Sequence, residues 1–315
     1  MNTSYGRLVT ETLQHHGTEI FDAVSTNNAL FFMLKKRGNI KVVAGGRVFT
    51  HPIYWKQNST FGSIAKLGTI PTGLQDDLTR AEYPIKVVAG SLNLSIMEEA
   101  MNAGNKEKLI DMAREVREGA EISMREVMGD QVWKDGTLPN DFDGLQHLVV
   151  AASTVGTVGG INRATAANAA WRNQIGTNIT TFSSQGQSRW NNLLNSCIFG
   201  TQGPTCVFTT KAIYALYEAS LTTNMRYYQT ELADSQFRHL AFATLPVLFD
   251  DNCPTNECYF LDLNSLWLQL LARGNFKVTP FQDSINQLSK VAKMFVFGNL
   301  TMGSGRTQGY IEASG

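Results

Sequence analysis

Residues of the types that commonly catalyse reactions or bind ligands are few and widely scattered in this sequence. His15, His16, His51, His147 and His239 form no obvious constellation, and we interpret each as a surface residue or a satisfied core residue. The sequence has no Gly-Lys pair for a phosphate-binding loop, no Gly-x-Ser-x-Gly nucleophile elbow, no His-Glu-x-x-His and no Cys-x-x-Cys. It therefore predicts no catalytic, metal-binding or cofactor-binding residues, and we do not expect an enzyme.

A glycine-rich stretch at 148–160, LVVAASTVGTVGG, is the nearest approach to a cofactor site. A strand that runs into a glycine turn is what a dinucleotide site requires. However, the spacing of Gly156, Gly159 and Gly160 is not Gly-x-Gly-x-x-Gly, and no acidic residue follows a second strand at the expected distance. We interpret this stretch as a flexible loop, and a dinucleotide-dependent enzyme remains a distant alternative.

Acids and cysteines gather near residue 250 without forming a recognisable site. Asp250 and Asp251 follow an expected strand, where catalytic carboxylates often stand, but turn residues explain them equally well. Cys253 and Cys258 would need two more ligands to hold zinc, and no histidine lies nearby in the sequence. We expect a buried thiol pair here, and we expect all four cysteines of the chain to be reduced.

Charge is low for a chain of 315 residues. Lys and Arg number 27 against 27 Asp and Glu, so the net charge is zero and only 17% of residues are charged. Neutrality argues against a dedicated nucleic-acid binder, and we expect Trp171 and Trp190 to pack in a core or an interface rather than stack on bases. No signal peptide and no run of eighteen apolar residues is seen, so we expect a soluble, non-secreted protein. A surface poor in charge is weakly protected against association.

The first hundred residues suggest an arm followed by a projecting hairpin. Residues 1–40 lack a sustained period, apart from a short helical stretch at 28–36. Residues 40–56 and 84–95 are rich in β-branched and aromatic types and predict two strands. The long excursion between them has no helical period, which suggests a β-hairpin that extends from the body.

The clearest predicted element is a long amphipathic helix over 105–128. A shorter helix is expected to begin near Ser95, because Glu98 stands at the capping-box spacing. In the long helix, apolar residues recur in steps of three and four, at Leu109, Met112, Ala113, Val116, Ala120, Met124 and Val127. Charged residues occupy the other faces, and Gly129 is the expected stop.

The second half of the chain alternates between helices and strands. Helices are predicted at 183–195 and 211–221, strands at 205–208, 245–250 and 258–263, and two further strands around Gly303 and Gly305. The predicted class is α+β. Arms and long hairpins bury little surface against their own chain, so this architecture suggests a subunit of an assembly.

Three segments carry a resemblance to a known family. They are FDGLQHLV at 142–149, TVGGINRATAANAAWRNQ at 157–174 and FVFGNLTMGSGRTQGYI at 295–311. Many sequences of that family have a Gly-Gly-Ile-x-Arg segment, then Trp-Arg-Asn, and a closing Gly-Asn-Leu. In these motifs and in the order of its elements, the chain resembles the major capsid proteins of tailed bacteriophages, whose Hong Kong 97-type fold is shared with encapsulin nanocompartments.

The resemblance implies a mechanical function. Pentamers and hexamers would close into an icosahedral head that encloses double-stranded DNA without sequence-specific binding, with no cofactor and no membrane. Scaffolding, portal and decoration proteins are the implied partners, the virion is the implied location, and assembly in the host cytoplasm is expected. An encapsulin-like shell around a cargo enzyme is the alternative.

The resemblance also implies a division of the chain. The implied parts are an N-terminal arm at 1–40, an E-loop with its flanking strands at 41–92, a peripheral domain at 93–179 and 277–315 with a spine helix at 105–128, and an axial domain at 180–276. Some relatives cross-link covalently through an E-loop lysine. Lys66 lies in that region, but nothing near it in the sequence supports this chemistry, so we do not expect a cross-link.

Overall fold

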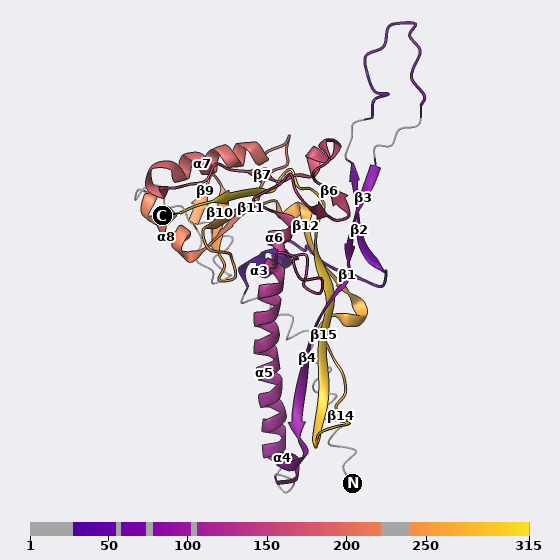
Figure 1. The fold of residues 1–315 in the computed structure, drawn as a ribbon, viewed down its shortest axis with the longest axis vertical. Coiled ribbons are helices and arrows are strands. Elements are labelled where there is room, and N and C mark those ends of the chain that lie inside the picture. The colour runs from indigo at the N-terminus through magenta and orange to yellow at the C-terminus, as the bar shows by residue number, and fades with distance from the viewer. Residues whose placement is uncertain (1–27, 55–57, 74–77, 102–105, 222–239, 315) are drawn as a thin grey trace.

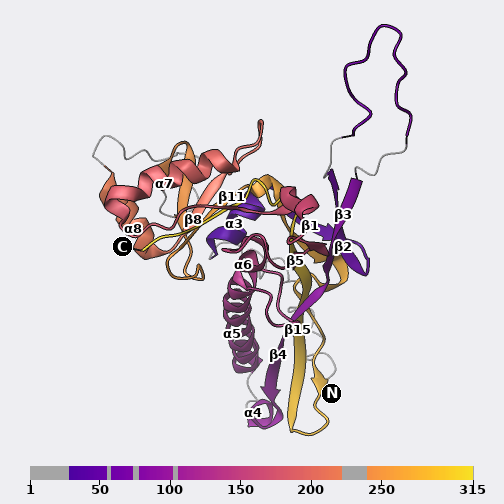
Figure 2. The same ribbon diagram turned by 45° about the horizontal axis from the view of Figure 1, so that its top comes forward.

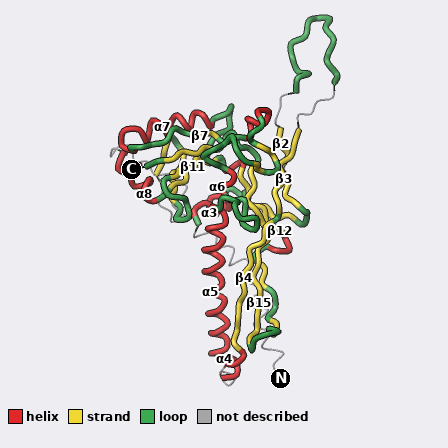
Figure 3. Tube along the Cα trace, viewed as in Figure 1, coloured by secondary structure: helices red, strands yellow, loops and turns green. Residues whose placement is uncertain are grey.

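A long helix and two long strands form a narrow lower part of the molecule, beneath a broader upper part (Figure 1). The computed structural model describes residues 28–54, 58–73, 78–101, 106–221 and 240–314. Within these ranges lie two six-stranded sheets and two small two-stranded sheets. Helices and strands are interleaved along the chain, as Figure 3 shows, in agreement with the predicted α+β class.

One six-stranded sheet is organised around a single long strand, β15. The sheet consists of β1 (Ile40–Val43), β4 (Lys86–Ser95), β12 (Leu266–Leu271), β13 (Lys277–Val278), β14 (Gln282–Asp283) and β15 (Ser289–Met302). The first ten residues of β15 pair with the whole of β4, antiparallel, and its last five residues pair with β12. The strand β15 therefore connects the narrow lower part to the upper part (Figure 2).

The helix α5 (Lys106–Trp133) lies along β4 and corrects the prediction in two ways. It continues past Gly129, where a side-chain Cβ would come within 2.7 Å of the Asn252 amide nitrogen, so this glycine permits a close approach rather than a stop. The last turn of α5 is stabilised by Trp133, which is buried. Its ring packs against that of Tyr259, with 5.5 Å between the two centroids. Val127, predicted to face the core, is 43% exposed.

The second six-stranded sheet has a separate core built on aromatic side chains. Its strands are β7 (Gln174–Ile175), β8 (Cys206–Thr209), β9 (Leu240–Phe242), β10 (Leu245–Phe249), β11 (Glu257–Leu261) and β16 (Gly309–Glu312), and the helices packed with it are α7 (Phe182–Cys197) and α8 (Lys211–Ser220). Trp190 on α7 is fully buried, and its ring lies 4.9 to 5.6 Å from four other aromatic rings, those of Phe182, Tyr217, Phe242 and Phe260.

The projecting hairpin consists of β2 (Val48–Tyr54) and β3 (Leu78–Pro84), which pair with one another in a sheet of their own. The prediction that 40–56 forms one strand and pairs with 84–95 is wrong. The strand is interrupted around Gly45 and Gly46, so that two strands form. β1 pairs with β12, and β2 begins the hairpin. The segment 84–95 yields β4, whose partner is β15. Pairing depends on strands far apart in sequence, which a local pattern does not reveal.

The helix predicted at 28–36 is confirmed as α3 (Ala29–Lys36). Asn28 caps it, because its side chain accepts a hydrogen bond from the Phe31 amide at 2.9 Å. Residues 29–31 and 33–34 are buried, so this part of the predicted arm belongs to the packed body. Residues 1–27 lie outside the described ranges.

Short elements complete the structure. They are α4 (Ile96–Met101), α6 (Leu145–Leu148), β5 (Thr157–Val158), β6 (Ile161–Asn162) and the 3-10 turns η1 (Ala166–Trp171), η4 (Leu263–Ser265) and η5 (Ala272–Gly274). The helix predicted near Ser95 and the elements predicted between 183 and 263 are confirmed within a few residues. No helix in the described part of the chain is long and apolar enough to span a membrane.

The proposed domain ranges remain a prediction, and two strands cross them. β12 lies within the range given to the axial domain, yet it pairs with β15. β16 lies within the range given to the peripheral domain, yet it pairs with β11 and β7. The chain therefore passes between the two sheets more than once near its carboxyl end.

The aromatic core around α7 leads to a prediction about stability. Trp190→Ala removes a fully buried side chain and should lower the free energy of unfolding by about 3–5 kcal/mol. Leu138→Ala is the matched control, because Leu138 is large and apolar but 61% exposed, and it should change stability by less than about 0.5 kcal/mol. Urea denaturation followed by circular dichroism measures both. Equal stabilities of the two variants would contradict the assigned core.

Candidate assembly surface

The tip of the hairpin, residues 58–73, extends away from the rest of the molecule (Figures 1 and 2). It carries large apolar side chains that its own chain does not cover. Leu67 is 98% exposed and Phe61 is 79% exposed, while Ile64 and Ile70 are also exposed. Lys66 is the single charged residue in this stretch. A projecting, nearly uncharged segment with exposed apolar side chains has the character of a contact surface.

The root of the hairpin is attached to the body chiefly through side chains. In the described chain, no ladder joins β2 or β3 to either six-stranded sheet. Alternate residues face inward in register, with Phe49 opposite Tyr83 and His51 opposite Ala81, and all four are buried. The direction of the hairpin therefore depends on what these side chains contact.

His51 contacts two strands of the main sheet at once. Its Nε2 lies 2.8 Å from Thr301 Oγ1 and also contacts the side-chain amide nitrogen of Gln269. Its ring is stacked on Trp267 at 4.6 Å between centroids. Burial, with a smaller effect from the charge of Lys41, lowers the pKa of His51 to about 4. The ring is therefore neutral at pH 7.

Tyr83 and Asn299 fix the other strand of the root. The Tyr83 hydroxyl donates to the Met302 carbonyl at 2.9 Å and accepts from the Met302 amide at 3.2 Å, and burial raises the pKa of this hydroxyl. Asn299 donates to the Pro84 carbonyl at 2.9 Å and to the Asp143 carboxylate at 2.7 Å. Asn299 also accepts from the Asp143 amide at 2.8 Å, so 142–149 and 295–311 meet at this pair.

The segment 157–174 is folded on itself beside the root of the hairpin. Arg163 is fully buried and donates to the Leu148 carbonyl, and desolvation lowers the pKa of its guanidinium to about 10. Arg172 donates to the Arg163 carbonyl at 2.7 Å, and Trp171 donates to the Val158 carbonyl at 3.0 Å. These arginines and this tryptophan therefore organise the loop, in agreement with the expectation that Trp171 packs rather than stacks on bases.

The turn between β5 and β6 packs directly against β3. The Gly159 carbonyl accepts from the Glu82 amide at 2.9 Å, and Gly159 has a φ of 58°. A Cβ at Gly159 would lie 2.8 Å from Ala81 Cβ and 3.0 Å from the Tyr83 ring. Glycine is thus required both by the backbone conformation and by the close approach of the hairpin. The strand and helix of a dinucleotide site do not occur at 148–160: Gly159 allows close packing, while Gly156 and Gly160 adopt a positive φ with no side chain against them.

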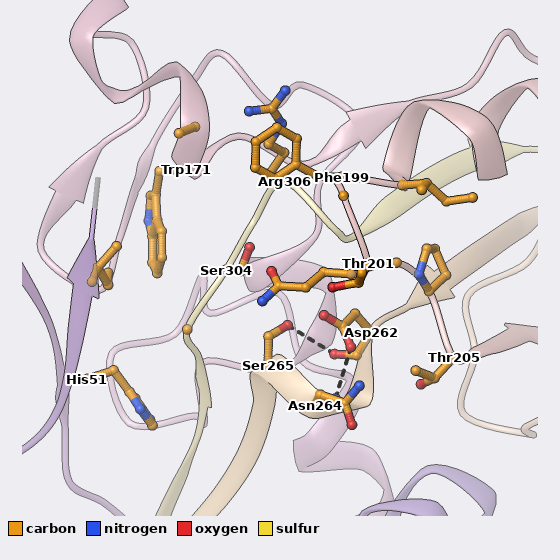
Figure 4. A pocket seen from close by; sticks show the side chains of 18 of the residues that line it. His51, Trp171, Phe199, Thr201, Thr205, Asp262, Asn264, Ser265, Ser304 and Arg306 are labelled. Carbon is orange, nitrogen blue, oxygen red and sulfur yellow. Dashed lines mark hydrogen bonds between the residues drawn. The ribbon is translucent and has the colours of Figure 1, made fainter. Parts of the chain in front are cut away.

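A cleft of about 1160 Å³ lies between the hairpin root and the loop that follows α7 (Figure 4). His51, Trp171, Phe199 and Arg306 are among its lining residues, and the Arg306 guanidinium lies 3.8 Å from the centre of the Phe199 ring. Asp262 also lines it and accepts from the Asn264 amide and the Thr307 hydroxyl, both at 3.0 Å. Burial raises the pKa of Asp262. The Asp262 carboxylate therefore accepts hydrogen bonds from its own chain and stabilises the wall of the cleft.

The fold itself has known relatives among solved structures, although no family model and no curated protein matches the chain. A chain of the cyanophage A-1(L) capsid superposes with a TM-score of 0.60 at 14% identity, covering 89% of this chain and 92% of that one. The capsid of a native GTA particle gives 0.57 at 9% identity, covering 89% of each chain. The chain has the Hong Kong 97-type capsid fold.

The same capsid fold is found in a protein nanocompartment. The SrpI encapsulin of Synechococcus elongatus PCC 7942 superposes with a TM-score of 0.54 at 8% identity, covering 88% of this chain and 86% of that one. The fold predicted from the three sequence motifs is thus confirmed over most of the chain. At these identities the likeness establishes the fold alone.

The acidic residues and cysteines near residue 250 form hydrogen bonds, an ion pair and buried packing contacts within the chain. The Asp250 carboxylate accepts from the Asn252 amide at 3.0 Å and from the Leu30 amide at 3.4 Å, so it joins α3 to the end of β10, and burial raises its pKa. Asp251 forms an ion pair with Lys211 at 2.6 Å. Cys253 and Cys258 are buried and unbridged, and burial raises the pKa of both thiols.

The sequence pattern does not reveal the residues that fix the hairpin. His51 is one of five scattered histidines, and Tyr83 lies in the excursion between the two predicted strands. Asn299 belongs to the Gly-Asn-Leu ending, which is the one signal that points to it. In the described residues, no group of three or more His, Cys, Asp or Glu side chains could hold a metal ion.

The contact of the β5–β6 turn with the hairpin can be tested with two adjacent glycines. Gly159→Ala must place a methyl group against Ala81 and Tyr83, whereas Gly160→Ala meets nothing within 4 Å at a φ of 76°. Both substitutions carry the cost of a positive φ, so their difference isolates the contact. Gly159→Ala should be less stable than Gly160→Ala by about 1–3 kcal/mol in urea denaturation. Equal losses would refute the packing of the turn on the hairpin.

Proposed function

We propose that this chain is the major capsid protein of a tailed bacteriophage. In this proposal it is a structural subunit, without a catalytic step, that forms the pentamers and hexamers of an icosahedral head around double-stranded DNA. The observation that carries the proposal is the exposed apolar tip of the hairpin, in a fold whose solved relatives include phage and GTA capsids.

The apolar tip explains why a neighbour is needed. Leu67 and Phe61 expose most of their surface to water in the isolated subunit. Burying each such side chain contributes about 1.5–3 kcal/mol. A second copy of the chain that receives the tip supplies this burial, and its own tip is then received by a third copy. Such head-to-tail contacts produce closed rings when the rotation between copies closes, and rings are the units from which a shell is built.

The charge balance supports enclosure rather than binding of DNA. A net charge of zero gives no general attraction to a phosphate backbone, whereas DNA-binding proteins depend on that attraction for affinity. A shell needs only to surround its contents. The proposal includes scaffolding, portal and decoration proteins as partners, assembly in the host cytoplasm, and the virion as the final location.

An encapsulin-like nanocompartment is the second candidate function, because the SrpI encapsulin has the same fold. The two candidates differ in what the shell contains. A phage head holds double-stranded DNA, while a nanocompartment holds a cargo protein. Absorbance spectra and denaturing gels of particles isolated from the native source distinguish a nucleic-acid content from a protein content.

Negative-stain electron microscopy after size-exclusion chromatography tests the common part of both candidates. The purified full-length chain, alone or with a co-expressed scaffolding protein, should form closed shells or rings of five and six. A compact monomer under both conditions, with residues 58–73 resistant to protease, would exclude a shell function, since an uncovered tip should be cut readily.

The role of the tip in assembly leads to a specific prediction. Leu67→Gln combined with Ile70→Gln should reduce the yield of shells or rings at least tenfold, because each lost apolar contact weakens association by about 1.5–3 kcal/mol. Sedimentation velocity measures the assembled fraction. Far-UV circular dichroism and the melting temperature should not change, since neither side chain packs in the subunit core.

Ser63→Gln is the matched control, because it replaces one exposed polar residue with another in the same stretch. It should assemble like the unmodified chain. Normal assembly of the double variant would show that the tip is not a contact between subunits.

A further inference from the structure

At the root of the hairpin, His51 contacts two strands of the body simultaneously. Phe49 and Ala81 contribute apolar packing, and Tyr83 binds the backbone of β15. His51 contacts the side chains of Gln269 on β12 and Thr301 on β15, and it stacks on Trp267. Towards the tip from His51 and Ala81, the described residues of both strands are exposed or half-buried, so His51 is the last buried residue of β2 on the way to the tip among the residues whose burial is described.

The groups that face His51 do not favour a positive charge. Lys41 on β1 places its Nζ 4.8 Å from the centre of the Trp267 ring on which His51 is stacked. Tyr83 on β3 lies 6.3 Å away between ring centroids. The hydrogen-bond partners of the imidazole among the described residues are Thr301 and Gln269, and no carboxylate is one of them. A proton on this ring would add a buried charge without a counter-ion.

The hairpin cannot compensate for the loss of this contact by itself. It is a two-stranded sheet without a ladder to the body in the described residues. An isolated two-stranded hairpin is only marginally stable in water. The side chains at the root therefore decide both the direction of the hairpin and how well its own backbone hydrogen bonds are protected.

We propose that His51 is a pH-sensitive latch. The neutral ring holds the β2–β3 hairpin against β12 and β15, and protonation releases the root of the hairpin while the body stays folded. The latch is a property of the single subunit, so it goes beyond the proposed shell function and does not depend on it.

The size and sign of the effect follow from the two protonation equilibria. In the latched state the pKa of His51 is about 4, and in the released state it returns to the ordinary 6.5. The released state therefore binds more protons between these values, so its population rises as the pH falls from about 6.5 to about 4 and then levels off. Between pH 7 and pH 5 the equilibrium should shift by about 20-fold towards release.

Hydrogen exchange of the full-length, unassembled chain, read by mass spectrometry, measures this release. Protection factors corrected for the intrinsic exchange rate are compared at pH 7, 6 and 5. In peptides from β2 and β3 they should fall about 20-fold between pH 7 and pH 5. Peptides from α7, in the other core, should keep their protection. A constant protection of the hairpin overturns the proposal, and so does a parallel loss in α7, which would mean global unfolding.

Two substitutions act on the latch in different ways. His51→Phe keeps an aromatic ring on Trp267 but cannot take up a proton, so hairpin protection should not depend on pH. Gln269→Glu places a carboxylate beside the imidazole and stabilises its protonated form, so the hairpin should stay protected at pH 5. If His51→Phe does not fold, Gln269→Glu still tests the proposal.

His147→Gln is the control, because His147 belongs to α6 and has no part in the hairpin contacts. It should reproduce the 20-fold loss of the unmodified chain. If His147→Gln abolishes the loss, or if Gln269→Glu retains it, His51 is not the latch.

Discussion

The carboxyl end of β15 holds segments that lie far apart in the sequence. Asn299 binds Asp143 and the Pro84 carbonyl, Thr301 contacts His51, and Met302 exchanges two hydrogen bonds with Tyr83. The side chains of Asn299, Thr301, His51 and Tyr83 are buried, so each would carry a desolvation penalty without its partner. The first ten residues of the same strand form the ladder with β4. The narrow lower part, the hairpin and the loop at 142–149 are thus positioned by one strand.

The hairpin combines two opposite surfaces. Its root is buried and its position depends on specific hydrogen bonds and ring contacts, while its tip exposes Leu67 and Phe61 to solvent. This contrast is what the proposed contact between subunits requires. An apolar tip gains free energy from contact in many orientations, because hydrophobic burial is not directional. The directional interactions at the root are what give the tip a defined position.

The three sequence motifs that resemble phage capsid proteins act as connections within the subunit. Asp143 of the first motif is bonded to Asn299 of the third. In the second, Arg163 and Arg172 donate to main-chain carbonyls, and Gly159 allows the turn to approach β3. Charged and polar residue types in such patterns could suggest a binding site. Here the arginines donate to main-chain carbonyls and Asp143 is bonded to the Asn299 side chain, so these residues satisfy hydrogen-bonding groups within the chain itself.

The elements with a local pattern are predictable from the sequence. The apolar spacing of α5, the short helical stretch of α3 and the β-branched run of β4 are local features, since helix and strand periods place side chains on one face wherever the element lies. The pairing of β2 with β3, the continuation of α5 past Gly129 and the role of His51 come from the three-dimensional fold. Each of these depends on groups distant in the sequence, on β12, on β15 or at Asn252, and such contacts leave no periodic signal in the chain.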